Sequence, residues 1–507
     1  MLFNSYEFLF VFLPLTVAGY FLLGRFGSAT VAKLWLILTS LFFYGWWNPV
    51  YLILLVGSIL INFWFGSRLA RKPDRGWLIT GIVFNLGLLG YFKYAGFFVS
   101  TIAAISGSDW QIEAIVLPLA ISFFTFQQIA FLVDAYRSES SESDFLSYCL
   151  FVTFFPQLIA GPIVHHKQML PQFARPETFT FQAASVSTGV TVFFLGLFKK
   201  VVLADSIAVY GSPVFAAADA GAAVTFFEAW GGALAYTFQL YFDFSGYSDM
   251  AIGLALIFGI RLPVNFESPY KAVSISDFWR RWHITLSTFL RDYLYIALGG
   301  NRQGPVRRYI NLALTMLLGG LWHGAGWTFV IWGGLHGLYL IINHAWRRVV
   351  SAAVSGSRVY GLFAWALTFL CVVIGWVFFR AESLDGALSM LAGMSGLNGA
   401  QLDVRLAGWL SVLSPLVDFK GSHAGAFRLD GAPWILALGF VAFFMPNVRE
   451  LVRYQPPGKG SSELTDSTPG KVWHWKPSLV WTVLLTAVAI TAIFRMNRIS
   501  EFLYFQF

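Results

Sequence analysis

The sequence predicts an all-α polytopic membrane protein, built as a bundle of roughly 11 to 14 transmembrane and re-entrant helices. Of the 507 residues, 57% are hydrophobic and only 12% are charged, whereas about a quarter of a soluble domain is charged. The apolar residues form runs close to the ~20 residues that cross a bilayer core. We therefore expect a single membrane-embedded domain over 1–507.

The apolar runs define the candidate spans. They lie at 8–24, 33–47, 50–67, 77–98, 114–133, 145–164, 186–204, 229–259, 309–328, 330–346, 361–379, 432–446 and 478–494. The run 145–164 carries Pro156, Gly161 and Pro162. It could be re-entrant, because broken backbone at membrane depth is tolerated where protein or a cavity surrounds it.

Basic residues set the expected topology. Four of them lie between two apolar runs: Arg68, Arg71, Lys72 and Arg75. The positive-inside rule assigns such a loop to the cytoplasm, and counting the spans from there places both termini on the outer side. The formal net charge is +8, but the bases follow the short loops and form no continuous stripe. We therefore expect no nucleic-acid partner.

Three polar regions interrupt the spans. Region 260–308 holds the densest group of basic residues: Arg261, Lys271, Arg280, Arg281, Arg291, Arg302, Arg307 and Arg308. We expect it to be a cytoplasmic loop region, which either orients the protein against phospholipids or docks an anionic donor from the cytosol. Region 380–431 is predicted to be a long outward loop, and region 454–477 a cytoplasmic linker before the last span.

The main candidate for chemistry is His323, which lies in a stretch, 309–342, without any Asp, Glu, Lys or Arg. An ionisable group in such a stretch is a candidate functional site. Desolvation disfavours the charged imidazole, so we expect a neutral ring that can act as a general base. No serine-elbow or HExxH motif accompanies it. We infer that His323 activates the hydroxyl of a bound substrate, which attacks an acyl donor directly.

Four other histidines admit functional and structural interpretations. His283 lies 40 positions before His323 and could converge with it in the fold, where it would orient the donor or bind a developing oxyanion. It could equally form a hydrogen bond between helices, which is the favoured interpretation of His336. His165 and His166 are predicted to be loop residues. No metal site is expected, since one needs three or four converging ligands.

Polar side chains in 239–250 form a second cluster in an apolar stretch. Gln239 and Asp243 are its members of interest, because a carboxylate at membrane depth is costly unless it is paired. Asp243 either pairs with arginines of 260–308 to hold the fold or shapes a donor cavity. The full set of candidate donor-binding or cavity-lining residues is Trp279, Arg280, Arg281, Trp322, Asp243 and Gln239.

Two motifs carry a resemblance to a known family. The runs 278–283 (FWRRWH) and 320–324 (GLWHG) resemble the core of the membrane-bound O-acyltransferase family. The segment 154–163 (FFPQLIAGPI) and the tail 502–507 are similar to its bacterial alginate O-acetylation branch. The chain also resembles the teichoic acid D-alanyl transfer proteins of the same family.

The resemblance implies a bundle around a central funnel, which joins a cytoplasmic donor site to an outward acceptor site in a bacterial inner membrane. It implies that His323 matches the family's essential membrane histidine and His283 its second polar position, often Asn in other branches. It further implies acetyl-CoA as the acyl-donor substrate, with no bound cofactor. The loop 380–431 and both termini would then be periplasmic.

The function implied is transfer of an acetyl group across the membrane for O-acetylation of an exopolysaccharide, alginate-like or cellulose-like. The implied partners are membrane lipids and a periplasmic acetyltransferase of the same polysaccharide system. Two alternatives stay open. One is a transporter or flippase of an acetylated lipid- or sugar-linked intermediate. The other is a structural subunit that anchors a secreted enzyme through the loop 380–431.

Overall fold

A computed structural model describes residues 1–113, 115–138, 144–351, 354, 356–420, 430–457, 474–497 and 503. Most of the predicted linker, part of the predicted loop 380–431 and the tail 502–507 apart from Leu503 lie outside these residues. The chain forms two compact units. The first contains Met1–Phe198, Gly246–Asn265 and Val448–Phe505, and the second contains Lys199–Ser245 and Phe266–Asn447.

The first unit is helical throughout its regular structure. Its elements are η1 (Phe8–Phe12), α1 (Leu13–Phe26), α2 (Ala29–Gly45), α3 (Val50–Arg71), α4 (Arg75–Leu89), η2 (Gly90–Tyr94), α5 (Ala95–Ser106), α6 (Ile121–Tyr136), α7 (Phe145–Thr153), α8 (Phe155–Leu158), α9 (His166–Phe173), η3 (Pro176–Phe179), α10 (Ala183–Phe198), the second part of α12 (Phe226–Ile257), α21 (Val448–Val452) and α22 (Leu479–Arg495).

Buried polar pairs join helices within this unit. Asn62 of α3 and Asn85 of α4 exchange amide hydrogen bonds of 3.2 and 2.6 Å, and both side chains are 0% exposed. Such pairs satisfy polar groups that lipid cannot. The prediction that His166 is a loop residue is wrong: it begins α9 and is buried, with its Nδ1 3.5 Å from a carboxylate oxygen of Asp134. Asp134 lies on α6, and the sequence does not predict that α6 and His166 are neighbours.

The interruption predicted within 145–164 is confirmed. Helix α7 ends at Thr153, and Phe154 has a non-helical backbone with ψ 104°. The short helix α8 follows and carries Pro156 near its start. The re-entrant path of this segment stays a prediction.

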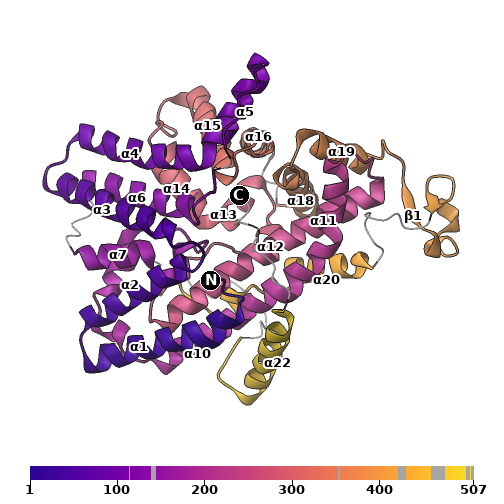
Figure 1. Ribbon diagram of the computed structural model, residues 1–507. Helices are drawn as coiled ribbons and strands as arrows, with labels where there is room; N and C mark the ends of the chain where they lie inside the picture. The colour runs from indigo at the N-terminus through magenta and orange to yellow at the C-terminus, as the bar shows by residue number, and fades with distance from the viewer. Residues whose placement is uncertain are drawn as a thin grey trace. The chain divides into compact units, whose positions relative to one another are not determined.

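The second unit holds the candidate site. Its elements are η4 (Lys199–Ala204), α11 (Asp205–Asp219), the first part of α12, η5 (Pro269–Lys271), α13 (Ile275–Arg281), α14 (Ile284–Phe289), η6 (Leu290–Tyr295), α15 (Gly304–His323), α16 (Trp327–Val349), α18 (Arg358–Arg380), α19 (Leu384–Met394), η7 (Val404–Leu406), η8 (Ser411–Leu413) and α20 (Gly431–Phe444), with strands β1 (Gln401–Asp403) and β2 (Asp418–Lys420). The strands pair in parallel, Leu402 opposite Phe419, and lie on the orange segment of Figure 1.

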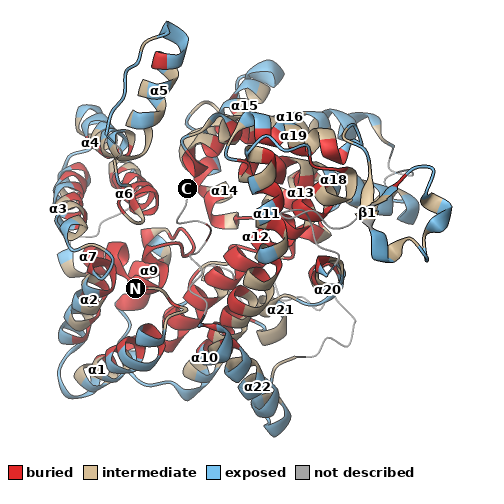
Figure 2. Ribbon diagram, turned by 45° about the vertical axis from the view of Figure 1, so that its right-hand side comes forward, coloured by how far each residue is buried: buried red, intermediate tan, exposed pale blue. Residues whose placement is uncertain are grey.

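Four helical stretches in the described residues are long and apolar enough to cross a membrane: Phe8–Phe26, Val50–Arg71, Arg75–Ser106 and Arg358–Arg380. Shorter apolar helices are Ala29–Gly45, Leu384–Met394, Gly431–Phe444 and Leu479–Arg495. Exposed faces are frequent on the helices of the first unit (Figure 2), and many carry large apolar side chains, such as Ile53 and Ile105. Such surface is expected where a helix faces lipid.

Candidate active site

The hairpin of α15 and α16 sets the position of His323. Both helices carry glycine where they meet. A Cβ on Gly320 would lie 2.3 Å from the carbonyl oxygen of Phe329, and one on Gly333 would lie 2.3 Å from that of Met316. A side chain at either position would push the helices apart, so glycine permits the close contact between α15 and α16.

His323 is the last residue of α15 and is 3% exposed. Three aromatic rings surround it, with centroids 4.9 Å away for Trp322, 5.1 Å for Trp332 and 5.2 Å for Phe379. The C-terminal end of a helix carries a partial negative charge that favours a nearby cation. This end of α15 would therefore stabilise a protonated ring of His323.

His283 occupies the sharp turn between α13 and α14. Its backbone is left-handed, with φ 43° and ψ 52°, a conformation uncommon outside glycine but enriched for histidine. Its side chain is 0% exposed, and its ring centroid is 4.9 Å from that of Phe244 on α12. Burial lowers the pKa of the His283 imidazole to about 3. A neutral ring has one nitrogen that donates a hydrogen bond and one that accepts.

The structure brings these two histidines together. Their ring centroids are 6.3 Å apart and their planes meet at 64°. This separation is too large for a direct hydrogen bond of about 3 Å, but a small group between the rings could contact both. Trp322, a predicted cavity residue, flanks the pair: it is 4% exposed, and its ring centroid is 6.1 Å from that of His283.

His336 has a different environment. It is 0% exposed, and its Nδ1 accepts a hydrogen bond of 3.2 Å from the indole nitrogen of Trp279. The ring of Trp332 lies near both histidines, with centroids 4.9 Å from His336 and 5.1 Å from His323. A histidine whose nitrogen already accepts such a bond is typical of contacts between helices. Trp279, predicted to line the donor cavity, serves this contact.

The two predicted arginines differ in their exposure and in their hydrogen bonds. Arg281 donates from Nε to Asp277 at 3.0 Å and from Nη1 to the carbonyl oxygen of Glu267 at 3.3 Å. It thereby ties α13 to the preceding segment. Arg280 is exposed and donates from Nε to the carbonyl oxygen of Ser276 at 3.2 Å. Arg280 is thus the better placed of the two to meet an anion from solvent.

Asp243, on α12, belongs to a buried cluster of charged side chains. Its side chain is 1% exposed, and one carboxylate oxygen lies 2.5 Å from the Lys200 ammonium, which also lies 2.9 Å from Asp205. A buried carboxylate needs such a counter-charge. The sequence leaves two roles open for Asp243, pairing with arginines of 260–308 or shaping a donor cavity, and neither of them includes the Lys200 partner that the structure shows. Gln239, one turn earlier, is 8% exposed.

Sequence reasoning missed Lys200 and the rings of Trp332 and Phe379 beside His323. A signal for Lys200 existed, because it lies inside the apolar run 186–204, where a lysine is costly unless paired. The aromatic residues gave no comparable signal among the many in the chain. Within the described ranges, no group of three His, Cys, Asp or Glu side chains is arranged to hold a metal ion.

Comparison with known proteins identifies the family. The model of the membrane-bound O-acyltransferase family matches residues 132–381, which include both histidines. A peptidoglycan O-acetyltransferase of Helicobacter pylori is 47% identical over 432 residues, covering 79% of this chain and 81% of that protein. A "Probable alginate O-acetylase AlgI" of Pseudomonas putida is 40% identical over 524 aligned residues and covers 100% of both chains.

A more distant relative is the teichoic acid D-alanyltransferase of Streptococcus thermophilus, which is 29% identical over 45% of this chain and 57% of its own. Together with the apolar helices, these matches make the protein a multi-pass membrane acyltransferase. The chain belongs to the membrane-bound O-acyltransferase family.

Proposed function

We propose that this chain moves an acetyl group from cytoplasmic acetyl-CoA across the inner membrane for O-acetylation of an exopolysaccharide, alginate-like or cellulose-like. A periplasmic acetyltransferase is the proposed partner that completes the transfer. The observation that carries the proposal is the buried pair of His283 and His323, 6.3 Å apart, in a chain whose relatives are named for O-acetylation of alginate and peptidoglycan.

In the proposed reaction, His323 takes the proton of the acceptor hydroxyl as its oxygen attacks the carbonyl carbon of the thioester. As negative charge develops on the carbonyl oxygen, this oxygen accepts a hydrogen bond from the His283 ring. When the intermediate collapses, the carbon–sulfur bond breaks, and the proton held by His323 passes to the departing thiolate. The products are an acetyl ester and free coenzyme A.

The donor is proposed to enter from the cytoplasmic side at 260–308. Arg280, which is exposed at the end of α13, would bind phosphates of coenzyme A, since guanidinium groups pair well with phosphate. Trp322 would line the path to the histidines. Arg281, Trp279, Asp243 and Gln239 would shape the surroundings of the site rather than contact the donor.

The decisive experiment substitutes His323 with Ala and with Gln in cells that acetylate their polymer through this chain. We expect at least a ~100-fold loss of acetylation, because a general base contributes about 10²- to 10⁴-fold, with protein abundance unchanged. The measurements are O-acetyl content of the polymer and the amount of protein in membranes. The matched control is His344→Ala, which changes a partly exposed histidine beside Arg347 and Arg348.

Undiminished acetylation by His323→Ala at normal abundance would remove the assigned role and favour a structural subunit. A transporter or flippase would be identified differently. In that case the purified protein would neither bind nor turn over acetyl-CoA, but would move a lipid-linked sugar in liposomes.

The relatives suggest two different acceptors. The relative from Helicobacter pylori is named for peptidoglycan, whereas the relative from Pseudomonas putida is named for alginate. Deletion of this chain, followed by O-acetyl analysis of the exopolysaccharide and of peptidoglycan from the same cells, separates the two. Loss confined to peptidoglycan would replace the acceptor proposed above while leaving the acyl-transfer chemistry in place.

A further inference from the structure

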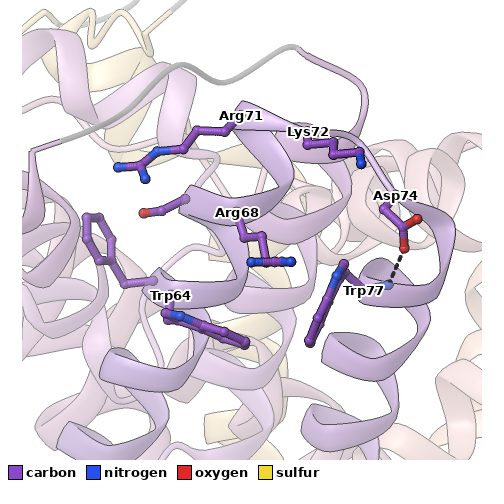
Figure 3. Close-up of a pocket in the computed structure, with 8 residues that line it drawn as sticks. Trp64, Arg68, Arg71, Lys72, Asp74 and Trp77 are labelled. Atoms are coloured by element: carbon purple, nitrogen blue, oxygen red, sulfur yellow. Dashed lines mark hydrogen bonds between the residues drawn. The ribbon is translucent and has the colours of Figure 1, made fainter.

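A cationic pocket lies in the first unit, between the last turn of α3 and the first turn of α4. It encloses about 510 Å³. The lining residues that matter for its chemistry are Trp64, Arg68, Arg71, Lys72, Asp74 and Trp77, and Figure 3 shows them around the opening. The residues that line the pocket belong to the first unit, whereas the two histidines and their contacts described above belong to the second.

The charges of this pocket are unbalanced. Among the described residues, Arg68, Arg71 and Lys72 have no carboxylate within 4.0 Å and make no side-chain hydrogen bond. Of the described residues that line the pocket, Asp74 alone is acidic. It accepts a 3.0 Å hydrogen bond from the backbone N–H of Trp77, which caps α4. Three cations and one carboxylate give the lining a net charge of +2, which favours an anionic occupant.

Aromatic rings hold one of the cations in place. The guanidinium of Arg68 lies 4.7 Å from the ring centroid of Trp77, a distance at which a cation and an aromatic face attract each other. The indoles of Trp64 and Trp77 are 5.3 Å apart and nearly perpendicular. In Figure 3 the Arg68 guanidinium lies beside the Trp77 indole and above the Trp64 indole. The guanidinium is therefore oriented before any ligand arrives.

The place of the pocket along the chain indicates the kind of anion. It lies where two stretches apolar enough to span a membrane, Val50–Arg71 and Arg75–Ser106, meet at a short connection. The end of a span is at the depth of the lipid headgroups, where tryptophan is enriched. The positive-inside rule assigns this connection to the cytoplasmic leaflet, whose anionic lipids attract clustered basic residues.

We propose that this pocket binds the phosphate of an anionic phospholipid from the cytoplasmic leaflet. Arg71 and Lys72 contact the phosphate oxygens, Arg68 contacts them from its position against the Trp77 indole, and the acyl chains lie along the apolar faces of α3 and α4. A soluble phosphate compound offers the same anionic group without acyl chains, so the test must separate these two sources.

The test uses the full-length protein purified in detergent, with phosphatidylglycerol and phosphatidylcholine as probes in native mass spectrometry. We expect wild type to retain phosphatidylglycerol in preference to phosphatidylcholine. The variant Arg68→Gln/Arg71→Gln should bind phosphatidylglycerol at least about tenfold more weakly. The control Arg347→Gln/Arg348→Gln removes two adjacent exposed arginines elsewhere and should bind it like wild type.

Competition identifies the source of the phosphate. Coenzyme A or inorganic phosphate at millimolar concentration should leave the bound phosphatidylglycerol in place, because neither supplies acyl chains. Displacement by either compound would overturn the proposal in favour of a soluble anion, as would equal binding of both lipids by wild type. Arg71→Gln alone serves if the double variant does not fold, because this exposed side chain makes no hydrogen bond to the part of the chain that the structure describes. Unchanged binding by this variant would also count against the site.

Discussion

His283 and His323 are held by different backbone conformations, and this difference decides what a substitution at each position reports. His323 ends a regular helix, where most residues can take its place without strain, so a change there alters mainly the imidazole. His283 has a left-handed backbone, in which a β-branched residue is an outlier. A substitution at 283 therefore affects both the chemistry and the turn between α13 and α14.

Two variants of His283 separate these effects. We expect His283→Asn to reach normal abundance, because asparagine tolerates the left-handed conformation, and to retain measurable acetyl transfer through its amide N–H. His283→Val should be destabilised by about 1–3 kcal/mol from backbone strain and should accumulate less. Abundance in membranes and acetyl-CoA turnover by purified protein are the measurements. Equal abundance of the two variants would show that the turn does not restrict this position.

At this scale, the sequence could predict candidate site residues but not how they are arranged. Both histidines stand out because each follows a tryptophan in its motif. Their separation could not be predicted, since it depends on how α13, α14 and α15 pack. The same limit explains Lys200. Its burial was visible in the apolar run, but its partner Asp243 depends on which helices are neighbours.

At the scale of elements, the contact between α15 and α16 depends on glycine at particular positions and not on glycine content. Gly333 faces the backbone of α15, where a Cβ would lie 2.3 Å from the carbonyl oxygen of Met316. Its neighbour Gly334 has room, since a Cβ there would lie 3.5 Å from the end of the Leu317 side chain. The two adjacent glycines therefore form a matched pair for substitution.

Gly333→Ala should force α15 and α16 apart, because a backbone carbonyl cannot yield as a flexible side chain can. We expect a loss of about 1–3 kcal/mol of stability and reduced acetyl transfer, since Trp332 would move relative to His323. Gly334→Ala should be as stable as wild type or better, because alanine favours a helix over glycine by up to about 1 kcal/mol. Thermal unfolding in detergent and turnover of both proteins provide the comparison; identical behaviour would contradict the packing argument.

Helices within the apolar runs were predictable from run length, whereas the polar regions were not. Region 380–431 was expected to be a loop, but it contains α19 and the paired strands β1 and β2. Ser383 caps helix α19: its hydroxyl oxygen accepts from the N–H of Gly386, while Asp219 accepts from the N–H of Ser383. Ser383 and Asp219, which form the second of these bonds, are 164 residues apart in the sequence, so no local sequence pattern could predict it.

At the scale of the whole molecule, composition was sufficient to predict the class. The low fraction of charged residues and the length of the apolar runs depend on no tertiary contact. The grouping of the spans does depend on such contacts: Val448–Phe505 belongs to the same unit as Met1–Phe198. Hydropathy does not identify neighbouring helices, so the sequence could not predict that the C-terminal segment belongs to the same unit as the N-terminal helices.

The sidedness of the chain is the prediction on which the proposed donor route rests. With Cys149 and Cys371 changed to serine, a single cysteine can be placed at Pro73, in the connection after α3, or at Leu397, which is 81% exposed after α19. A membrane-impermeant maleimide should label Leu397→Cys in intact spheroplasts, and Pro73→Cys only after permeabilisation, because basic loops stay in the cytoplasm.

The cysteine-free parent is the control for this experiment, and permeabilised spheroplasts show that each introduced thiol can react. The opposite pattern would place the loop after α3 outside and 380–431 inside. By the same count of spans, the basic region 260–308 would then face a compartment without acetyl-CoA. That result would exclude cytoplasmic entry of the donor at Arg280, while the chemistry proposed for the two histidines would still be open to test by His323→Ala.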